Sequence, residues 1–354
     1  MGNAAENQHA VIGARQSLDD EFRTPRNEWF FKGGLLGLFM HYGISTVNGE
    51  GDLSWGMVDA TPWDADEGGN FTITPREYYN LAREFNPVHF DPDNWLRAAK
   101  DAGFTYAVFT TRHHDGFSMW PSDVSELSTK NFMHGRDLVG EYIEACRKNG
   151  IKAGLYYSPP DWYLERYYRS FFWKSFEPDK YPGFKPGGLD HEELDELLPI
   201  PAALQDDILR YVDAQLRELL TRYGKIDILW FDGAAQDLKR VLTPQEIFEL
   251  QPDIVMNDRM YGKGYNSQYE CSMPKEKPPT FFEHCDIWME NCGWAHMKRC
   301  TGYRSAQWAY DKYKKISEWG GNTLLNVGPT ADGTLPDVYY QRMSELKALL
   351  AEGK

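Results

Sequence analysis

The sequence predicts an α/β fold in which a single TIM-like (β/α)8 barrel occupies residues 33–354 and follows an N-terminal arm at residues 1–32. Short apolar runs alternate with longer helical patterns along the chain, an order typical of parallel strands joined by helices. No G-x-G-x-x-G motif follows the first apolar run, and no G-x-x-x-x-G-K motif occurs. The chain therefore lacks the phosphate-binding loops of nucleotide-binding open sheets, and a barrel is the favoured architecture.

The predicted strands are short apolar runs that mostly end at polar side chains. The run at residues 226–231 is the clearest, because five of its six residues are apolar and it stops at Asp232 and Gly233. A carboxylate in this position is held by a rigid element at the open face of a barrel. The predicted strands are residues 35–40, 106–111, 152–157, 226–231, 254–257, 280–283 and 323–327.

Helical patterns separate these strands, and some carry clear start and stop signals. Asp91 and Pro92 open one helix and Gly103 ends it, while Gly150 ends the helix at residues 137–149. Further helices are predicted at residues 75–85, 203–223, 244–250, 303–319 and 337–352. Long loops are predicted at residues 48–70, 162–201 and 261–279. The last of these loops contains Glu270, and the N-terminal arm is expected to have no role in the core.

Several predicted strands end in side chains that suit a ligand rich in hydroxyl groups. A barrel brings the carboxyl ends of all its strands to one mouth, so these side chains are expected to meet there. A single histidine after a strand is more often structural, but five such endings in one chain favour a functional site. The strand-end residues are His41, His113, His114, Tyr157, Trp230, Asp232, Asn257 and Arg259.

Glycoside cleavage is the chemistry that suits this set best. An ionised carboxylate on a strand end can attack an anomeric carbon, and a second carboxyl group can protonate the departing oxygen. Asp232 suits the first role, and Glu270 and Glu283 are the downstream candidates for the second. Histidines and an arginine would donate hydrogen bonds to hydroxyl groups, and Trp55 or Trp230 would stack on a sugar ring.

Charge and composition limit the classes of ligand that the chain can bind. A net charge of −15 would repel a phosphate backbone, so nucleic acid is disfavoured. Aromatic residues make up 15% of the chain, which agrees with a neutral sugar ligand. No apolar run is long enough to cross a bilayer, and the first thirty residues lack a signal-peptide core. We expect a soluble protein that is cytoplasmic, or periplasmic or secreted if a signal was removed.

The cysteines predict neither a disulfide framework nor a structural zinc site. Their number, five, is odd, and no C-x-x-C pair occurs. Four of them lie between residues 271 and 300, but their spacing matches no zinc pattern. All five are therefore expected to be free thiols, mostly buried.

Over about residues 33–335, the chain resembles the α-L-fucosidases of glycoside hydrolase family 29. The most specific match is the double-histidine segment TTRHHDGFSMWPS at residues 110–122. The other matching segments are LFMHYG at 38–43, GLYYS at 154–158, WFDG at 230–233, NDR at 257–259 and GGNTLLNVGP at 320–329.

This resemblance implies a retaining exo-hydrolase that releases terminal α-L-fucose from an oligosaccharide or glycoconjugate through a covalent glycosyl-aspartate. It implies Asp232 as nucleophile and Glu270 as acid/base, with Glu283 as the second candidate. No cofactor, metal or membrane partner is implied, and the oligomeric state is left open. A C-terminal β-sandwich, common in the family, is not expected. The implied sugar-binding positions are His41, His113, His114, Tyr157, Trp230 and Arg259, and Trp55 and Glu283 are further substrate-binding candidates.

One departure from the family pattern bears on the sugar. The family usually has S-E-W in its first loop, whereas this chain has Leu53-Ser54-Trp55. A carboxylate near the sugar is therefore missing, and an α-L-galactosidase is an alternative, since L-galactose differs from L-fucose only by a hydroxyl group on C6.

Two further alternatives come from other classes of protein. One is a fucose-binding pseudoenzyme that keeps the pocket but lacks an effective acid. The other is a metal-dependent hydrolase that uses His41, His113, His114 and Asp232. It is disfavoured because adjacent histidine side chains are expected to diverge and no H-E-x-x-H motif occurs.

Overall fold

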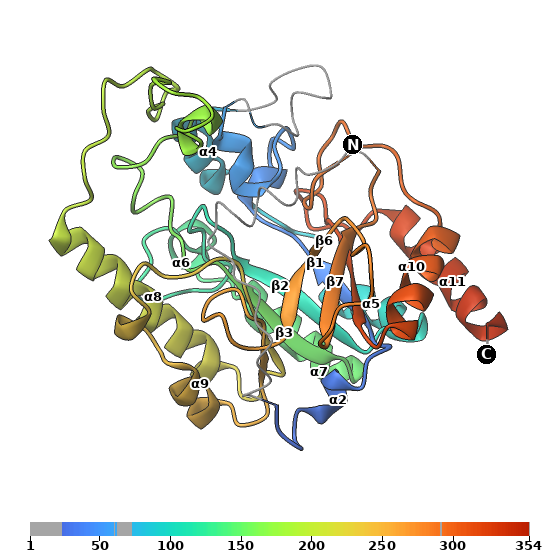
Figure 1. Cartoon of the computed structure of the whole chain (residues 1–354). Coiled ribbons are helices and arrows are strands. Elements are labelled where there is room, and N and C mark those ends of the chain that lie inside the picture. The colour runs from blue at the N-terminus through green and yellow to red at the C-terminus, as the bar shows by residue number, and fades with distance from the viewer. Residues whose placement is uncertain (1–22, 60, 62–72, 291, 354) are drawn as a thin grey trace.

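The computed structural model describes residues 23–59, 61, 73–290 and 292–353, and its centre is one curled sheet of eight parallel strands (Figure 1). The sheet order is β5-β4-β3-β2-β1-β8-β7-β6, so strands that are neighbours in sequence are paired, except β5 and β6, and β8 pairs with β1. The strands are β1 Leu36–Met40, β2 Tyr106–Arg112, β3 Lys152–Tyr157, β4 Ile228–Phe231, β5 Val255–Met256, β6 Asn266–Glu270, β7 Phe282–Ile287 and β8 Asn322–Val327.

The two outer strands of this order, β5 and β6, are linked just beyond their ends. Asn257 and Tyr265 form an isolated parallel bridge, and the Tyr265 backbone N–H donates to the Met256 carbonyl at 3.0 Å. This arrangement is consistent with the predicted TIM-like (β/α)8 catalytic domain. The domain boundary between residues 32 and 33 remains a prediction.

The predicted helices are all present, with boundaries that shift by a few residues. Capping accounts for several of them: Asp91 accepts from the Asn94 N–H at 3.1 Å, and Gly150 takes the left-handed conformation at φ 61° after α7. None of the described helices is long and apolar enough to cross a bilayer. The α-helices are α2 Glu28–Phe31, α4 Pro75–Asn80, α5 Pro92–Asp101, α6 Thr129–Phe132, α7 Leu138–Asn149, α8 Ala202–Arg222, α9 Pro244–Leu250, α10 Ala306–Glu318 and α11 Asp337–Glu352.

The prediction of one long loop at residues 261–279 is wrong, because strand β6 lies inside it. The strand Asn266–Glu270 reads N-S-Q-Y-E and has no apolar alternation. Its pairing with β7, rather than local propensity, makes it a strand. Glu270 is consequently the last residue of a barrel strand and not part of a free loop.

The expectation that the N-terminal arm has no core role is also wrong for residues 23–32. Phe30 of α2 is fully buried, and its ring lies 5.5 Å from that of Tyr106 and 4.7 Å from that of Tyr265. The Phe30 carbonyl also accepts a hydrogen bond from Asn322 at 2.9 Å. Figure 1 shows α2 below the sheet, where this aromatic contact covers the amino ends of the strands.

Candidate active site

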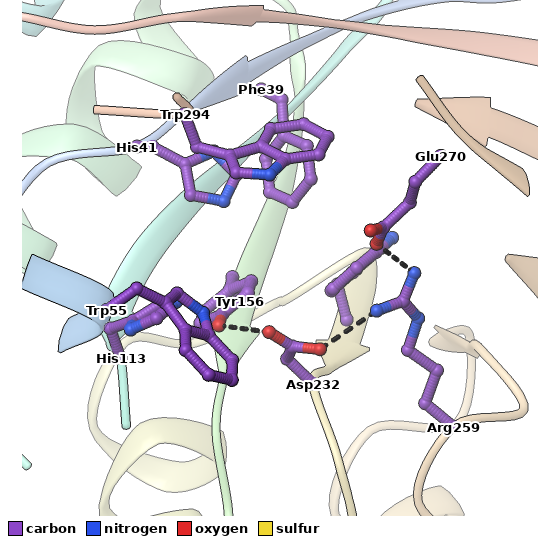
Figure 2. Close-up of a pocket in the computed structure, with 10 residues that line it drawn as sticks. Phe39, His41, Trp55, His113, Tyr156, Asp232, Arg259, Glu270 and Trp294 are labelled. Atoms are coloured by element: carbon purple, nitrogen blue, oxygen red, sulfur yellow. Dashed lines mark hydrogen bonds and ion pairs between the residues drawn. The ribbon is translucent and has the colours of Figure 1, made fainter. Parts of the chain in front are cut away.

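A small pocket opens at the carboxyl ends of the strands and holds most of the predicted residues (Figure 2). It encloses about 340 Å³ of empty space, counted out to its mouth. Strands β1, β3, β4 and β6 and the loops that follow the strands supply its walls. The lining residues are Phe39, His41, Trp55, His113, Tyr156, Trp230, Asp232, Arg259, Glu270 and Trp294.

Two carboxylates in this pocket share one guanidinium. Arg259 Nη1 donates to Asp232 Oδ1 at 2.8 Å, and Arg259 Nη2 forms an ion pair with Glu270 Oε1. Figure 2 shows the guanidinium between them. The Tyr156 hydroxyl donates to the other Asp232 oxygen at 2.6 Å. The two carboxylates come from different strands, β4 and β6, and are fixed relative to one another by Arg259.

Asp232 is held in its ionised form. Burial raises the pKa of this carboxyl group and the Arg259 guanidinium is the strongest influence that lowers it, and the resulting pKa lies below its usual range. Arg259 is 2% exposed, and the two carboxylates raise its pKa despite burial. The site therefore presents a permanent cation beside an ionised carboxylate at neutral pH.

Three histidines surround the carboxylate as neutral rings. Burial lowers the pKa of His41 and of His114 to about 4, and it lowers the pKa of His113 well below its ordinary value. His41 Nδ1 contacts Asn326 Oδ1 at 2.6 Å, and the amide nitrogen of Asn326 donates to the Trp294 carbonyl. His41 Nδ1 must then be the donor, which leaves Nε2 as an acceptor for a ligand hydroxyl group.

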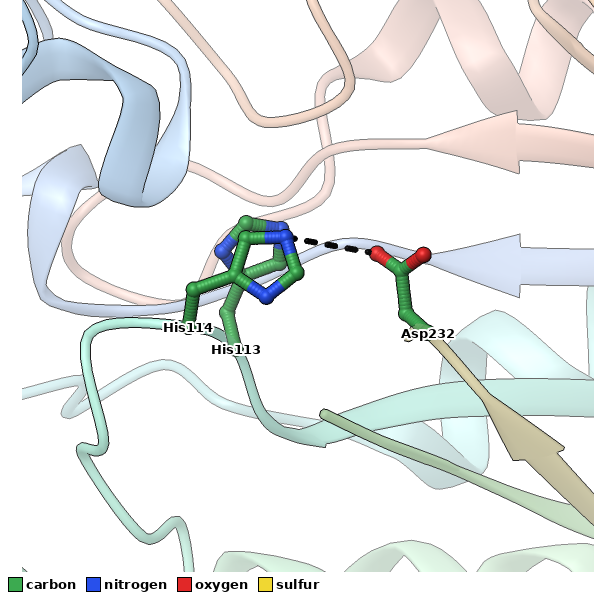
Figure 3. A group of neighbouring side chains, drawn as sticks. All are labelled: His113, His114 and Asp232. Carbon is green, nitrogen blue, oxygen red and sulfur yellow. Dashed lines mark ion pairs between the residues drawn. The ribbon is translucent and has the colours of Figure 1, made fainter. Parts of the chain in front are cut away.

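The adjacent histidines do not diverge, contrary to expectation. The rings of His113 and His114 lie 4.2 Å apart and both face Asp232 (Figure 3). His114 Nε2 is 3.6 Å from Asp232 Oδ2, and one ligand atom from each of the three residues lies within 4.8 Å of the others. The backbone bends directly after β2, so neighbouring residues there need not point to opposite faces.

Aromatic rings form the remaining wall of the pocket. The Tyr156 and Trp230 rings stack 5.5 Å apart, and the Phe39 ring contacts those of Trp230 and Trp294 at 5.0 and 5.9 Å. The Arg259 guanidinium lies over Trp230 at 4.3 Å. The pocket thus combines an apolar aromatic patch with two carboxylates and neutral histidines, which is the composition of a site for a monosaccharide.

Comparison with known proteins decides the family. A family model described as α-L-fucosidase matches residues 3–352. The chain belongs to the α-L-fucosidase family of glycoside hydrolases. The resemblance expected from the sequence motifs is confirmed, and so is the assignment of the chain as a glycoside hydrolase.

The relatives of this fucosidase include curated proteins and solved structures. It is 29% identical to the tissue α-L-fucosidase of Mus musculus over 96% of this chain and 71% of that protein. It is similar in structure to α-L-fucosidase isoenzyme 1 from Paenibacillus thiaminolyticus, with a TM-score of 0.74, 28% identity and coverage of 92% and 75% of the two chains. It is also similar to the α-L-fucosidase AlfC in complex with Fucα(1,6)GlcNAc, with a TM-score of 0.66, 27% identity and coverage of 92% and 98%.

Three of the predicted sugar-binding residues, Tyr157, His114 and Glu283, do not line the pocket. Tyr157 points to the outer face of β3, where its hydroxyl group bonds to Arg112 at 2.7 Å and to Gln215 at 3.0 Å. Its neighbour Tyr156 lines the pocket instead, because successive strand residues point to opposite faces. His114 Nε2 lies 3.6 Å from Asp232 Oδ2, but His114 is not among the pocket-lining residues.

Glu283 is not among the residues that line the pocket. It is fully buried in the barrel interior and accepts hydrogen bonds from Tyr106 at 2.7 Å, Trp230 at 2.9 Å and Tyr265 at 3.1 Å. Gly37 makes room for the Tyr106 ring, since a Cβ there would lie 2.2 Å from it. Glu283 therefore supports Trp230 from below and has no route to a sugar.

Burial raises the pKa of Glu283 from 4.5 to about 7, despite the three hydrogen bonds that oppose the shift. A carboxyl group with a raised folded-state pKa stabilises the fold below pH 4.5 and loses that contribution as pH rises to 7. The loss amounts to about 3 kcal/mol. In denaturant titrations between pH 4.5 and 8, Glu283→Gln should become more stable relative to the parent chain by about this amount. If the difference in stability between Glu283→Gln and the parent chain did not change with pH, the raised pKa of Glu283 would be contradicted.

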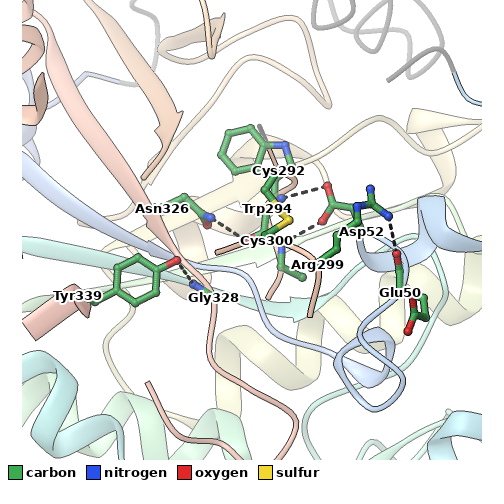
Figure 4. The surroundings of a disulfide bond; sticks show 10 residues. Glu50, Asp52, Cys292, Trp294, Arg299, Cys300, Asn326, Gly328 and Tyr339 are labelled. Atoms are coloured by element: carbon green, nitrogen blue, oxygen red, sulfur yellow. Dashed lines mark hydrogen bonds between the residues drawn. A yellow bond between two sulfur atoms is a disulfide. The ribbon is translucent and has the colours of Figure 1, made fainter. Parts of the chain in front are cut away.

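A disulfide in the pocket wall corrects the expectation of five free thiols. Cys292 and Cys300 are bonded, with their Cα atoms 5.9 Å apart, and the loop that they close carries Trp294 (Figure 4). The Asp52 carboxylate accepts from the backbone N–H groups of Trp294 at 3.0 Å and of Ala295 at 2.9 Å. The remaining cysteines, Cys146, Cys271 and Cys285, are free.

Asp52 connects two walls of the pocket. It precedes the 3-10 helix Leu53–Met57, which carries Trp55, and it also anchors the loop that carries Trp294. Ser54, at the position where the family usually has glutamate, contacts His113 Nδ1 at 2.5 Å through its hydroxyl group. The chain thus fills the place of the missing carboxylate with a serine that holds a pocket histidine.

Proposed function

We propose that this chain is a retaining exo-α-L-fucosidase in which Asp232 is the nucleophile and Glu270 is the acid/base. The observation that carries the proposal is the pair of carboxylates bound by the two terminal nitrogens of Arg259. Carboxylates that share one guanidinium lie a few ångströms apart. This arrangement places both carboxylates at one sugar, and we assign to them the retaining spacing of about 5–5.5 Å.

In the first step, an Asp232 oxygen attacks the anomeric carbon and Glu270 protonates the glycosidic oxygen, which leaves with the bonding electron pair. A glycosyl-aspartate remains. In the second step, Glu270 removes a proton from a water molecule, which attacks the same carbon and releases Asp232 as a carboxylate. Before the first step, Glu270 must leave its ion pair with Arg259 and take up a proton from solvent, while the bond from Tyr156 keeps Asp232 oriented.

The pocket walls support L-fucose as the sugar. We propose that the aromatic patch of Phe39, Tyr156, Trp230 and Trp294 receives the C6 methyl group. The neutral rings of His41 and His113 exchange hydrogen bonds with the ring hydroxyl groups. The small pocket suits one terminal residue, and the complex of the related AlfC with Fucα(1,6)GlcNAc supports a fucosylated glycan as substrate.

The test is the initial rate of hydrolysis of 4-nitrophenyl α-L-fucoside by the purified chain, with the α-L-galactoside beside it. We expect turnover of the fucoside and a kcat/KM about 10- to 100-fold lower for the galactoside, because an added hydroxyl group would lie unpaired against the aromatic patch. A higher kcat/KM on the galactoside would instead support the α-L-galactosidase alternative. L-Fucose binding without any turnover would support the pseudoenzyme.

The convergence of His113, His114 and Asp232 favours a metal-dependent hydrolase as a second candidate. Against it, Asp232 already accepts from Tyr156 and Arg259, and the nearby guanidinium repels a cation. We therefore expect fucoside hydrolysis to stay within twofold of its rate, on the order of experimental scatter, after dialysis against excess EDTA. Loss of activity that returns on addition of a divalent metal would establish the second candidate.

A further inference from the structure

A second pocket lies beside the first and shares Trp55 with it. It encloses about 1440 Å³ of empty space, counted out to its mouth. Its walls come from the segment between β3 and α8, from the first half of α8 and from the residues that follow Asp232. The proposed hydrolysis takes place in the first pocket and does not use the second.

A charged side chain in the second pocket makes few hydrogen bonds. The Arg169 guanidinium lies 3.9 Å above the Trp162 ring. Its one described hydrogen bond is a long one, from Nε to the Ser170 carbonyl at 3.4 Å. Within the described part of the chain, its terminal nitrogens make no hydrogen bond. They are therefore available to a ligand, and Arg169 lines the pocket.

The neighbouring groups complete a set that suits a sugar ring. Glu165 lines the same pocket and accepts from Gln236 at 2.7 Å. Trp162 lines the pocket between Arg169 and the His114 ring, on which it stacks at 5.1 Å, and it contacts the Trp55 ring edge-on at 5.0 Å. Donors and acceptors beside flat aromatic rings are the usual composition of a carbohydrate site. The net charge of −15 and the carboxylate of Glu165 disfavour an acidic sugar.

The position of the second pocket decides which sugar it can take. Its walls include His114, which faces Asp232, and Ala234 and Ala235, which follow Asp232 in sequence. The pocket therefore lies on the side of the nucleophile. In a retaining reaction, the leaving group departs on the face opposite the nucleophile. The sugar bonded through the cleaved oxygen would start on the side of Glu270 and not in this pocket.

We propose that the second pocket binds a further neutral pyranose of the same glycan, one that is not bonded through the cleaved oxygen. The inference rests on the proposed function, because it takes the fucose to lie in the first pocket. It makes this fucosidase an enzyme that favours extended or branched glycans, with Arg169 as the residue that binds the distant sugar.

The test compares substrates of increasing length in two variants and a matched control. Arg169→Gln removes the cation, and Leu197→Trp fills the pocket that Leu197 lines. Leu198→Trp is the control, since Leu198 is 60% exposed and lines neither pocket. The substrates are 4-nitrophenyl α-L-fucoside and neutral fucosylated di-, tri- and pentasaccharides, compared within the linkage that the parent chain cleaves best.

We expect kcat/KM of the parent chain to rise at least about tenfold from the disaccharide to the pentasaccharide. Arg169→Gln and Leu197→Trp should remove most of this gain and leave hydrolysis of the aryl fucoside unchanged. Leu198→Trp should retain both the gain with glycan length and the parent rate on the aryl fucoside. Equal kcat/KM for all lengths, or a gain that survives in both variants, would overturn the proposal.

A binding measurement separates this proposal from the proposed function. The defucosylated tetrasaccharide core of the same glycan is titrated into the chain by calorimetry. We expect Arg169→Gln and Leu197→Trp to weaken its binding at least about tenfold, and Leu198→Trp not to. This result would stand even if no fucoside were hydrolysed. Hydrolysis of the aryl fucoside with no effect of the variants on binding would reject only the second pocket.

Discussion

Replacement of Asp232 by alanine is expected to lower kcat for aryl α-L-fucosides by on the order of 10³-fold or more, because no carboxylate remains to attack the anomeric carbon. The fold should persist, since Asp232 lies after β4 at the pocket and not in the apolar core. Steady-state rates and thermal unfolding, measured on the same preparation, test both statements. Near-normal activity of a folded Asp232→Ala chain would refute the mechanism.

Two further variants sharpen this experiment. Asp232→Gly leaves room for azide, which should restore turnover and yield a fucosyl azide of inverted anomeric configuration, because the small anion attacks from the face that the nucleophile has vacated. Asp227→Asn is the matched control at the other end of the same strand segment. Asp227 pairs with Lys152 at 3.2 Å, far along the strand from the pocket, so fucoside hydrolysis should be unchanged.

Glu270→Ala should lower activity by an amount that depends on the leaving group. Natural oligosaccharides need a proton on the departing oxygen, so their kcat/KM should fall by about 10²- to 10⁴-fold. Fucosides with strongly acidic phenols need little protonation and should lose far less in the first step. A plot of the logarithm of kcat/KM against leaving-group pKa should therefore be much steeper for Glu270→Ala than for the parent chain.

Glu283→Gln is the control for this assignment. Glu283 is buried beneath Trp230 and reaches no substrate, so any loss of activity should be the same for all leaving groups. Equal loss on all substrates in Glu270→Ala, together with leaving-group dependence in Glu283→Gln, would transfer the acid role to Glu283. That outcome would require a different arrangement of β6 and β7 from the one described.

Much of the fold followed from local patterns. Apolar runs such as residues 226–231 mark buried strands because a parallel barrel covers both faces of each strand, and Asp91, Pro92 and Gly150 mark helix ends through backbone geometry. The polar strand Asn266–Glu270 escaped prediction, since only its pairing with β7 stabilises it. The burial of Phe30 was not predicted for a similar reason, because it depends on rings distant in sequence.

The sequence by itself determined the family, the barrel-type fold and the strand-end position of Asp232, because each depends on residues close together in the chain. The tertiary structure decided that Tyr156 and not Tyr157 faces the pocket, and that Glu270 and not Glu283 meets Arg259. It also paired Cys292 with Cys300 beside Trp294. These choices depend on which face of a strand looks inward and how deep each side chain lies. Both are set by packing between distant segments, which local pattern does not encode.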